Sequence, residues 1–344
     1  MKVITKEDFR TFVNRLIRED PRTVIGVKAR GNKFVFDELD SAEELRLDHD
    51  TTLLSPKKYF LPQYEALMRY DLTKGFDVKE VNVGEPCIII GVHPYDIAAI
   101  QQMDRILRDG TEDHHYLKRR ERSMIIGVNI KNPSPHAFAG SMGTAVVESG
   151  FDLMLTDIGN GYAIEIGTPQ GREVLERYAT AAEAGKEIAA EVAKIKERIP
   201  SKFQKQLQFP LKELPALLQK HMDDDPFWDE RSELCLSCGS CILTCPTCYC
   251  FDVQDIPDLS LRKGEKRRTW DGCMLEEFAK VATGENFRGT QSKRYRHRYL
   301  KKGLYLHTRF GIIGCVGCGR CASACLPDIA DPTKVFNALK EAAQ

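Results

Sequence analysis

The sequence predicts an α+β protein in two parts, and two observations support this prediction. Up to about residue 225, short apolar runs alternate with amphipathic segments, which is typical of strands mixed with helices. After residue 225 the composition changes, and eight of the twelve cysteines gather in two dense runs. We therefore expect a mixed α/β domain over residues 1–225 and a cysteine-rich domain over residues 226–344, since 344 residues suffice for two cores.

The elements of the first part follow from apolar spacing. Residues 1–20 place apolar side chains at helical intervals, which predicts an amphipathic surface helix. Strands are expected where short apolar runs occur, over residues 23–27, 87–92, 124–128, 151–156 and 162–166. Residues 172–198 are rich in Ala, Glu and Lys and end before Pro200, so we expect one long helix there, followed by another over residues 211–221.

The two cysteine runs have the same spacing. In each run, three cysteines are separated by two residues, and a fourth follows after three more. Three thiolates at this spacing surround one cubane iron-sulfur cluster, while the fourth reaches the neighbouring cluster. The pattern therefore predicts two 4Fe-4S clusters with crossed ligand sets: Cys235, Cys238, Cys241 and Cys325 for cluster 1, and Cys315, Cys318, Cys321 and Cys245 for cluster 2.

This motif predicts a mainly helical, ferredoxin-like dicluster domain with an insertion of about 70 residues between the runs. Structural zinc sites fit less well, because zinc motifs usually separate two Cys-x-x-Cys knuckles. Disulfides fit least, because the chain shows no secretory signal. No apolar stretch approaches the roughly 20 residues that span a bilayer, so we expect a cytoplasmic protein without a membrane span.

The insertion is basic, with 14 Lys or Arg against 5 Asp or Glu over residues 261–310. Such a segment beside Tyr295, Tyr299 and Tyr305 could bind nucleic acid. Cations beside an anionic cluster would instead offset its charge, and an exposed basic face could steer a redox partner. Because the net charge is zero, the redox or solvated-surface interpretation is favoured over nucleic-acid binding.

Four cysteines lie outside the two runs. Cys87 sits in an apolar run and is expected to be a core thiol. Cys248, Cys250 and Cys273 are either redox-active thiols, as in a reductase, or side chains that pack around the clusters, and packing is favoured because no basic or histidine partner is fixed by the sequence. No residue is assigned to catalysis, and no glycine-rich dinucleotide fingerprint is present.

Several segments together resemble a known family. They are SPKKYFLP, GVHPYDIAAI, FDLMLTDIGNGYAIEIGTPQG, CLSCGSCILTCPTCYCFDVQD, RRTWDGC, NFRGTQSKRYRHRYLKK and CVGCGRCASAC. The chain resembles the beta subunits of cytosolic nickel-iron sulfhydrogenases, a family that also includes the A subunit of anaerobic sulfite reductase. The resemblance covers most of the chain.

The resemblance implies a non-catalytic electron-relay subunit of an oxidoreductase complex. Such a subunit passes electrons between a flavin-containing, NAD(P)H-linked subunit and a catalytic redox subunit, and carries no flavin or nickel itself. The catalytic partner could be a hydrogenase, a heterodisulfide reductase-like enzyme or a sulfite reductase-like enzyme. Fold resemblance alone does not choose among these three.

One departure from the family pattern concerns a further cluster in the first part. Family members that relay to a hydrogenase often have cysteines there, in a GVHxCD-like motif, after the next strand and in a CFC-like motif. Here Tyr95 takes the first of these places, Asn129 or Ile130 the second, and Ala137 and Ala139 the close pair. None of these side chains supplies a thiolate, so the resemblance implies two clusters rather than three.

Overall fold

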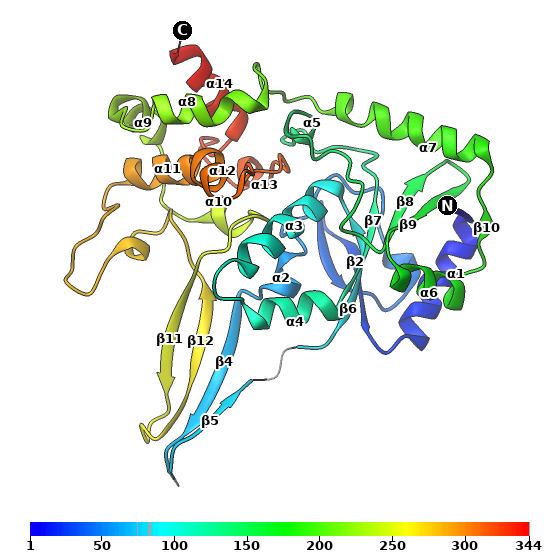
Figure 1. Cartoon of the computed structure of the whole chain (residues 1–344), viewed down its shortest axis with the longest axis horizontal. Coiled ribbons are helices and arrows are strands. Elements are labelled where there is room, and N and C mark those ends of the chain that lie inside the picture. The colour runs from blue at the N-terminus through cyan, green and yellow to red at the C-terminus, as the bar shows by residue number, and fades with distance from the viewer. Residues whose placement is uncertain (74, 82–83, 344) are drawn as a thin grey trace.

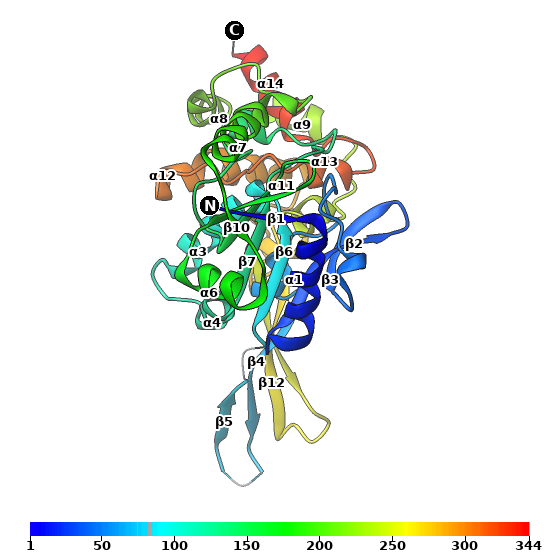
Figure 2. The ribbon, with the colours of Figure 1, turned by 90° about the vertical axis from the view of Figure 1, so that its right-hand side faces the viewer.

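The computed structural model describes residues 1–73, 75–81 and 84–343 of the chain. An eight-stranded sheet with helices on both faces forms the first part (Figure 1). Helices of the second part lie at one end of this sheet, and a four-stranded sheet projects away from both, as two views show (Figures 1 and 2). The predicted α+β fold is confirmed.

The large sheet is built from β1 (Lys2–Thr5), β2 (Thr23–Arg30), β3 (Lys33–Glu38), β6 (Cys87–Val92), β7 (Met124–Val128), β8 (Leu153–Asp157), β9 (Gly161–Ile166) and β10 (Ala182–Glu183). Their order is β10-β1-β9-β8-β7-β6-β2-β3. The four central strands β2, β6, β7 and β8 are parallel and largely apolar, as burial on both faces requires. The five predicted strands are confirmed as β2, β6, β7, β8 and β9.

Four helices cover the two faces of the sheet. They are α1 (Lys6–Glu19) and α6 (Pro169–Tyr178) on one face, and α3 (Pro94–Arg108) and α4 (His114–Arg122) on the other. Alternate strand residues point to opposite faces. In β6, Ile88 and Ile90 therefore pack with α1 and α6, whereas Ile89 packs with α3 and α4.

The opening helix is shorter than predicted, because residues 2–5 form β1 and pair with β9. Helix α1 begins at Lys6, where the Thr5 hydroxyl accepts the Asp8 N–H at 3.0 Å and caps the helix. Its apolar side chains Phe12 and Leu16 are fully buried against the sheet. The helix is thus amphipathic, with its apolar face forming part of the core.

The prediction of one long helix over residues 172–198 is wrong. Helix α6 ends at Tyr178, whose ring is anchored in the core, and Ala179 is extended. The chain then forms β10, which pairs with β1 at the sheet edge, and a second helix, α7 (Lys186–Arg198), begins after Gly185. The sheet edge offers backbone hydrogen bonds that outweigh the helix propensity of the alanines, and glycine is a poor helix former.

The helices of the second part surround an aromatic core. The main ones are α9 (Asp225–Ser232), α11 (Gln291–Leu300) and α14 (Pro332–Ala342), and α8 (Leu214–Lys220), which precedes residue 225, packs into the same core. Trp228, Tyr295, Tyr299 and Phe336 pack between them, in the same cluster as Cys241 and Cys321. The predicted helix over residues 211–221 is confirmed as a 3-10 turn (Leu211–Glu213) followed by α8. In the described part of the chain, no helix is long and apolar enough to cross a membrane.

The projecting sheet joins the two parts of the chain. It consists of β4 (Tyr64–Asp71), β5 (Asp77–Glu80), β11 (Phe251–Pro257) and β12 (Lys263–Trp270), in the order β11-β12-β4-β5. Strands β11 and β12 belong to the insertion between the cysteine runs, and β12 pairs antiparallel with β4 of the first part (Figure 1). The two parts are therefore connected by backbone hydrogen bonds as well as by side-chain packing.

A buried ion-pair network anchors the base of this sheet. Glu65 of β4 binds Arg119 of α4 and Arg268 of β12, with 2.7 Å between the Arg268 Nε and the Glu65 Oε1. Arg268 also pairs with Asp113. All four side chains have little or no exposure, so each charge depends on its partners.

Replacing Glu65 with Gln should lower the free energy of unfolding by about 3 kcal/mol, because it leaves two buried guanidinium groups without their shared carboxylate. Denaturant unfolding followed by circular dichroism measures this change. The matched control is Asp255→Asn, which removes an exposed pair with Lys266 in the same sheet and should cost less than about 1 kcal/mol. Equal effects of the two substitutions would contradict the assigned role of Glu65.

Candidate metal centre

The two cysteine runs fold into loops with the same backbone conformation. In the first loop Ser237 and Gly239 have φ angles of 49° and 75°, and in the second Gly317 and Gly319 have 67° and 77°. Each loop ends in a short helix, α10 (Ser240–Leu243) or α13 (Arg320–Ser323), and these helices pack against each other. The left-handed residues turn the chain tightly, which glycine allows at little cost. The two runs thus form a pair of similar loops facing each other.

The left-handed turn also directs backbone N–H groups at sulfur atoms. The Ser237 N–H donates to the Cys235 Sγ at 3.4 Å, and the Gly317 N–H is directed at Cys315 in the same way. Burial nevertheless raises the pKa of Cys315 to about 12. Hydrogen bonds to ligand sulfurs are among the contacts by which a protein tunes an iron-sulfur cluster.

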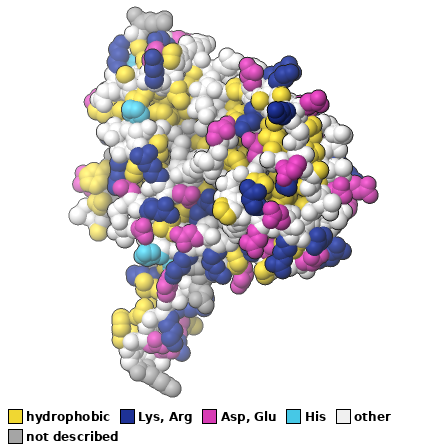
Figure 3. All heavy atoms as spheres, turned by 45° about the vertical axis from the view of Figure 1, so that its right-hand side comes forward, with side chains coloured by type: hydrophobic (Ala, Val, Ile, Leu, Met, Phe, Trp, Pro, Cys, Tyr) yellow, Lys and Arg dark blue, Asp and Glu magenta, His cyan; other side chains and the backbone are white. Residues whose placement is uncertain are grey.

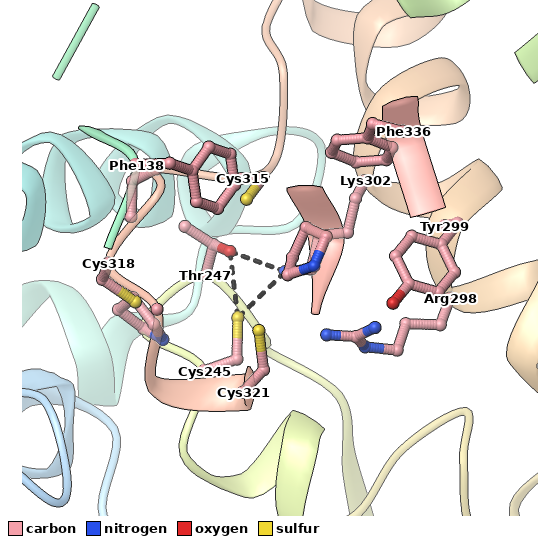
Figure 4. Close-up of a pocket in the computed structure, with 14 residues that line it drawn as sticks. Phe138, Cys245, Thr247, Arg298, Tyr299, Lys302, Cys315, Cys318, Cys321 and Phe336 are labelled. Carbon is pink, nitrogen blue, oxygen red and sulfur yellow. Dashed lines mark hydrogen bonds between the residues drawn. The ribbon is translucent and has the colours of Figure 1, made fainter. Parts of the chain in front are cut away.

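Four cysteines from both runs line one small, partly enclosed cavity (Figure 4). They are Cys245, Cys315, Cys318 and Cys321, the four residues predicted as the ligands of cluster 2. Cys245 comes from the first run, so the expected crossing of the fourth cysteine to the other set is present in the fold. Burial raises the pKa of Cys318 and of Cys321 to about 12, which means that the thiolate form requires a cationic partner.

The other four cysteines gather around Cys241. Burial raises the pKa of Cys241, Arg298 opposes that shift, and the neighbouring Cys235, Cys325 and Cys238 add to it. Cys241 is buried, Cys235 and Cys325 are half-buried, and Cys238 is exposed. These are the four residues predicted as the ligands of cluster 1, and the structure brings them together.

Two buried cations lie between and beside these sets. Arg298 of α11 lines the cavity and adjoins Cys241 of one set and Cys321 and Cys245 of the other. Its Nε and Nη1 have no hydrogen-bond partner among the described residues, and its Nη2 has only a long 3.5 Å contact with the Ala330 carbonyl. A buried guanidinium with unused donors requires an anionic acceptor.

The second cation is Lys302, in a π-helical turn (Lys301–Tyr305) that follows α11. Its Nζ donates to the Thr247 Oγ1 at 2.6 Å and to the Cys245 Sγ at 3.3 Å (Figure 4). Burial opposes its charge, but Cys245, Cys248 and Cys315 outweigh that effect and raise the pKa of Lys302. An anionic cluster with thiolate ligands and sulfide acceptors would satisfy both cations, so the residues present fit such a group.

A single metal ion fits less well. In the described part of the chain, no three side chains of His, Cys, Asp or Glu are placed so that they could hold one ion together. A mononuclear zinc site needs four ligands within about 2.3 Å of one centre. Sulfurs that surround a four-iron cubane must stand further apart, which agrees with the way four cysteines are distributed around one cavity.

The first part of the chain forms one wall of this centre. The Phe138 N–H donates to the Gly317 carbonyl at 2.8 Å, and the Thr144 hydroxyl donates to the Val316 carbonyl at 2.7 Å. Lys57 of α2 (Lys57–Phe60) donates to the carbonyls of Cys245 and Cys248. Backbone carbonyls of both cysteine runs thus accept hydrogen bonds from the first part.

A buried ion pair fixes the second loop to the first part. The Arg320 guanidinium binds both carboxylate oxygens of Asp96 at 2.6 and 2.7 Å, and donates to the Thr52 carbonyl at 2.8 Å. Burial opposes the charge on Arg320, but Asp96 outweighs it and raises the arginine's pKa. Because Arg320 lies between Gly319 and Cys321, this pair positions the cysteine loop.

The residues at the places of the further family cluster lie together in the fold. Tyr95, Ile130, Ala137 and Ala139 pack in one apolar cluster with Val316 and Cys318. Tyr95 is fully buried, and its hydroxyl lies 2.7 Å from the His93 Nδ1. Asn129 is also buried and donates to the Thr156 hydroxyl at 2.9 Å. Side chains therefore fill this region, and the two-cluster expectation stays a prediction.

Burial disfavours the thiolate form of the remaining cysteines. Burial raises the pKa of Cys250 and raises that of Cys273 to about 11, while hydrogen bonding to Cys245 and burial both raise that of Cys248. Cys87 is buried and contacts the Ser123 hydroxyl at 3.4 Å, as expected for a core thiol. A buried thiol with a raised pKa is a poor nucleophile.

The basic insertion uses much of its charge inside the molecule. Arg268, Arg294, Arg298 and Lys302 are buried. Others pair with acids: Lys263 with Asp71, Lys266 with Asp255, Lys280 with Glu277, Arg296 with Asp225 and Arg309 with Asp109. On the face in Figure 3, Lys and Arg are interspersed with Asp and Glu. Sequence reasoning counted Arg298 and Lys302 among the basic residues but gave no signal that they are internal.

Gly319 and Gly239 offer a matched test of the second loop, because both have a left-handed φ. A Cβ at Gly319 would lie 2.5 Å from the His136 backbone, whereas one at Gly239 would meet only the Leu275 side chain. Gly319→Ala should therefore remove about four iron atoms per chain, and Gly239→Ala should retain most of its iron. Iron analysis after anaerobic purification measures both, and equal losses would contradict the contact with the first part.

Comparison with known proteins bears on the same residues. A family model described as a 4Fe-4S dicluster domain matches residues 234–329, which include both cysteine runs. The chain is 31% identical over 336 residues to "Sulfhydrogenase 2 subunit beta" of Pyrococcus furiosus, a match that covers 97% of each protein. No solved structure matches the chain. The resemblance seen in the sequence is confirmed, and the chain belongs to the family of sulfhydrogenase beta subunits.

Proposed function

We propose that this chain is an electron-transfer subunit that holds two 4Fe-4S clusters. Cluster 1 would be held by Cys235, Cys238, Cys241 and Cys325, and cluster 2 by Cys315, Cys318, Cys321 and Cys245. The observation that supports this most strongly is the cavity in which four cysteines from two distant runs meet a buried arginine with unused donors. The dicluster domain match over the same residues gives independent support.

When bound, each cluster supplies a site that accepts and releases one electron. The chain supplies the surroundings that set how readily this happens. Arg298 and Lys302 offset negative charge next to the cysteines, and the N–H groups of Ser237 and Gly317 point at ligand sulfurs. Positive charge and hydrogen bonds at sulfur both favour the more reduced state. The aromatic core and Phe138 restrict solvent around the second set.

We propose two partner subunits, between which this chain would pass electrons. One is a flavin-containing, NAD(P)H-linked subunit, and the other is a catalytic redox subunit of hydrogenase, heterodisulfide reductase-like or sulfite reductase-like type. The name of the Pyrococcus furiosus relative identifies that protein as one subunit of a larger enzyme, which supports a multisubunit assembly. We place the cluster domain at residues 226–344 and the docking or scaffold domain at residues 1–225.

A second candidate function is a thiol-based reductase that acts through Cys248, Cys250 or Cys273. The raised pKa values of all three thiols disfavour it, because the thiolate is the reactive form. Nucleic-acid binding by residues 261–310 is disfavoured as well, since most cations of that segment are buried or paired. Electron transfer accounts for the buried cations and the cysteine sets together.

Serine substitutions separate the proposed ligands from the other thiols. Cys318→Ser should lower the iron content by about four atoms per chain and remove one of two cluster signals in electron paramagnetic resonance of the reduced protein. Cys241→Ser should remove the other signal. Cys250→Ser and Cys273→Ser are the controls and should keep both signals, because these residues belong to neither set.

The opposite pattern would contradict the assignment. Loss of iron from Cys250→Ser or Cys273→Ser, with full iron in Cys318→Ser, would place a cluster on different residues. A fully loaded Cys250→Ser or Cys273→Ser complex that fails to turn over would instead favour the thiol-based reductase.

A further inference from the structure

The two cysteine sets differ in their access to solvent. Of the eight cysteines, all of which lie in the described part of the chain, Cys238 alone is exposed. In the second set Cys318 and Cys321 are buried, and the first part of the chain covers that loop through Phe138 and Thr144. A partner protein can therefore approach the first set at Cys238 more closely than it can approach Cys318 and Cys321 of the second set.

Large apolar side chains flank the exposed set. Leu236 lies in the loop between Cys235 and Cys238 and is 64% exposed, and Leu234 just before it is 62% exposed. Leu326, which follows Cys325 directly, is 91% exposed. Three leucines thus adjoin the ligands of one set in the sequence while their side chains face solvent. Contiguous exposed apolar side chains mark interaction sites on soluble proteins.

Arg294 connects the first cysteine loop to the segment that carries a fourth exposed apolar residue. Its Nη2 donates to the Ser237 hydroxyl at 3.0 Å, and its Nη1 donates to the carbonyls of Arg288 and Gly289. Gln291 adds bonds from the same segment to the carbonyls of Ser232 and Glu233. These bonds hold the backbone that follows Phe287 beside the first cysteine loop, and the Phe287 side chain, which belongs to the insertion, is 63% exposed.

We propose that the surface formed by Leu234, Leu236, Phe287 and Leu326 around Cys238 docks another subunit of the complex, one that carries a redox cofactor beneath an apolar face of its own. This inference rests on the proposed function. One electron at a time would pass between that cofactor and the first cysteine set, one being oxidised as the other is reduced, with no bond made or broken. We call this surface the Cys238 face.

The kind of partner follows from the surface. A small soluble carrier would gain little from four large apolar side chains, whereas a protein interface has an apolar centre surrounded by polar residues. The Arg294 and Gln291 bonds hold two segments together, so docking costs little ordering of the chain. Apolar contact also excludes water from the path between the two redox groups.

The test uses the native complex, purified anaerobically through a tag on this chain. Leu236→Glu and Leu326→Glu should each lower the recovery of one partner subunit about tenfold, because a charge would have to be buried at the interface. Iron content and reduction by dithionite, which needs no docking, should stay unchanged. The control is Leu259→Glu, which changes a fully exposed leucine in the turn between β11 and β12 and should leave the complex intact.

Several outcomes would contradict the proposal that the Cys238 face docks a partner subunit. They are full partner recovery with both variants, loss of the same subunit from Leu259→Glu, loss of only a second copy of this chain, and a wild-type chain that purifies without partners. These results would not contradict the proposal that the chain holds two clusters. A wild-type chain that contains no iron would instead overturn the proposed function itself, so the two failures can be told apart.

Discussion

The arrangement of the cysteine-rich part depends on positive charge buried among thiols. Arg298 and Lys302 are almost fully enclosed, and Arg298 reaches cysteines of both sets with donors that have no partner among the described residues. A buried charge that lacks a counter-charge is strongly unfavourable. Anionic clusters held by the two sets would supply that counter-charge, so ligand binding and folding of this part are expected to be linked.

The first part of the chain is a wall of the same centre rather than a separate body. Arg320, between Gly319 and Cys321, is fixed by Asp96 and Thr52, and Gly319 itself leaves no room for a Cβ against His136. The Glu65 network and the β4–β12 pairing make a second connection at the base of the projecting sheet. The first part covers the loop of one cysteine set, whereas Cys238 of the other set is exposed.

Cysteine spacing predicted which residues gather, because the loop conformation is local: Gly239 and Gly319 have nearly equal φ angles in the two runs. Tertiary contacts were harder to predict from the sequence. Strand β12 contains many charged residues, so its sequence lacks the alternation of apolar and polar side chains that indicates a strand. Its cations are accommodated because they pair with Glu65, Asp113 and Asp71. The sequence also did not show which cations of residues 261–310 are buried, Arg298 and Lys302 among them. Residues 172–198 were misassigned because sheet pairing at β10 overrides helix propensity.

The most direct test of the two-cluster account is to quantify iron and acid-labile sulfide on the native, anaerobically purified chain. The account predicts about eight of each per chain, since each four-cysteine set would hold a 4Fe-4S cluster. About twelve irons would contradict it, because a third cluster would then have to lie elsewhere, despite the packing of Tyr95, Ala137 and Ala139. Zinc in place of iron would contradict it as well, because zinc does not transfer electrons.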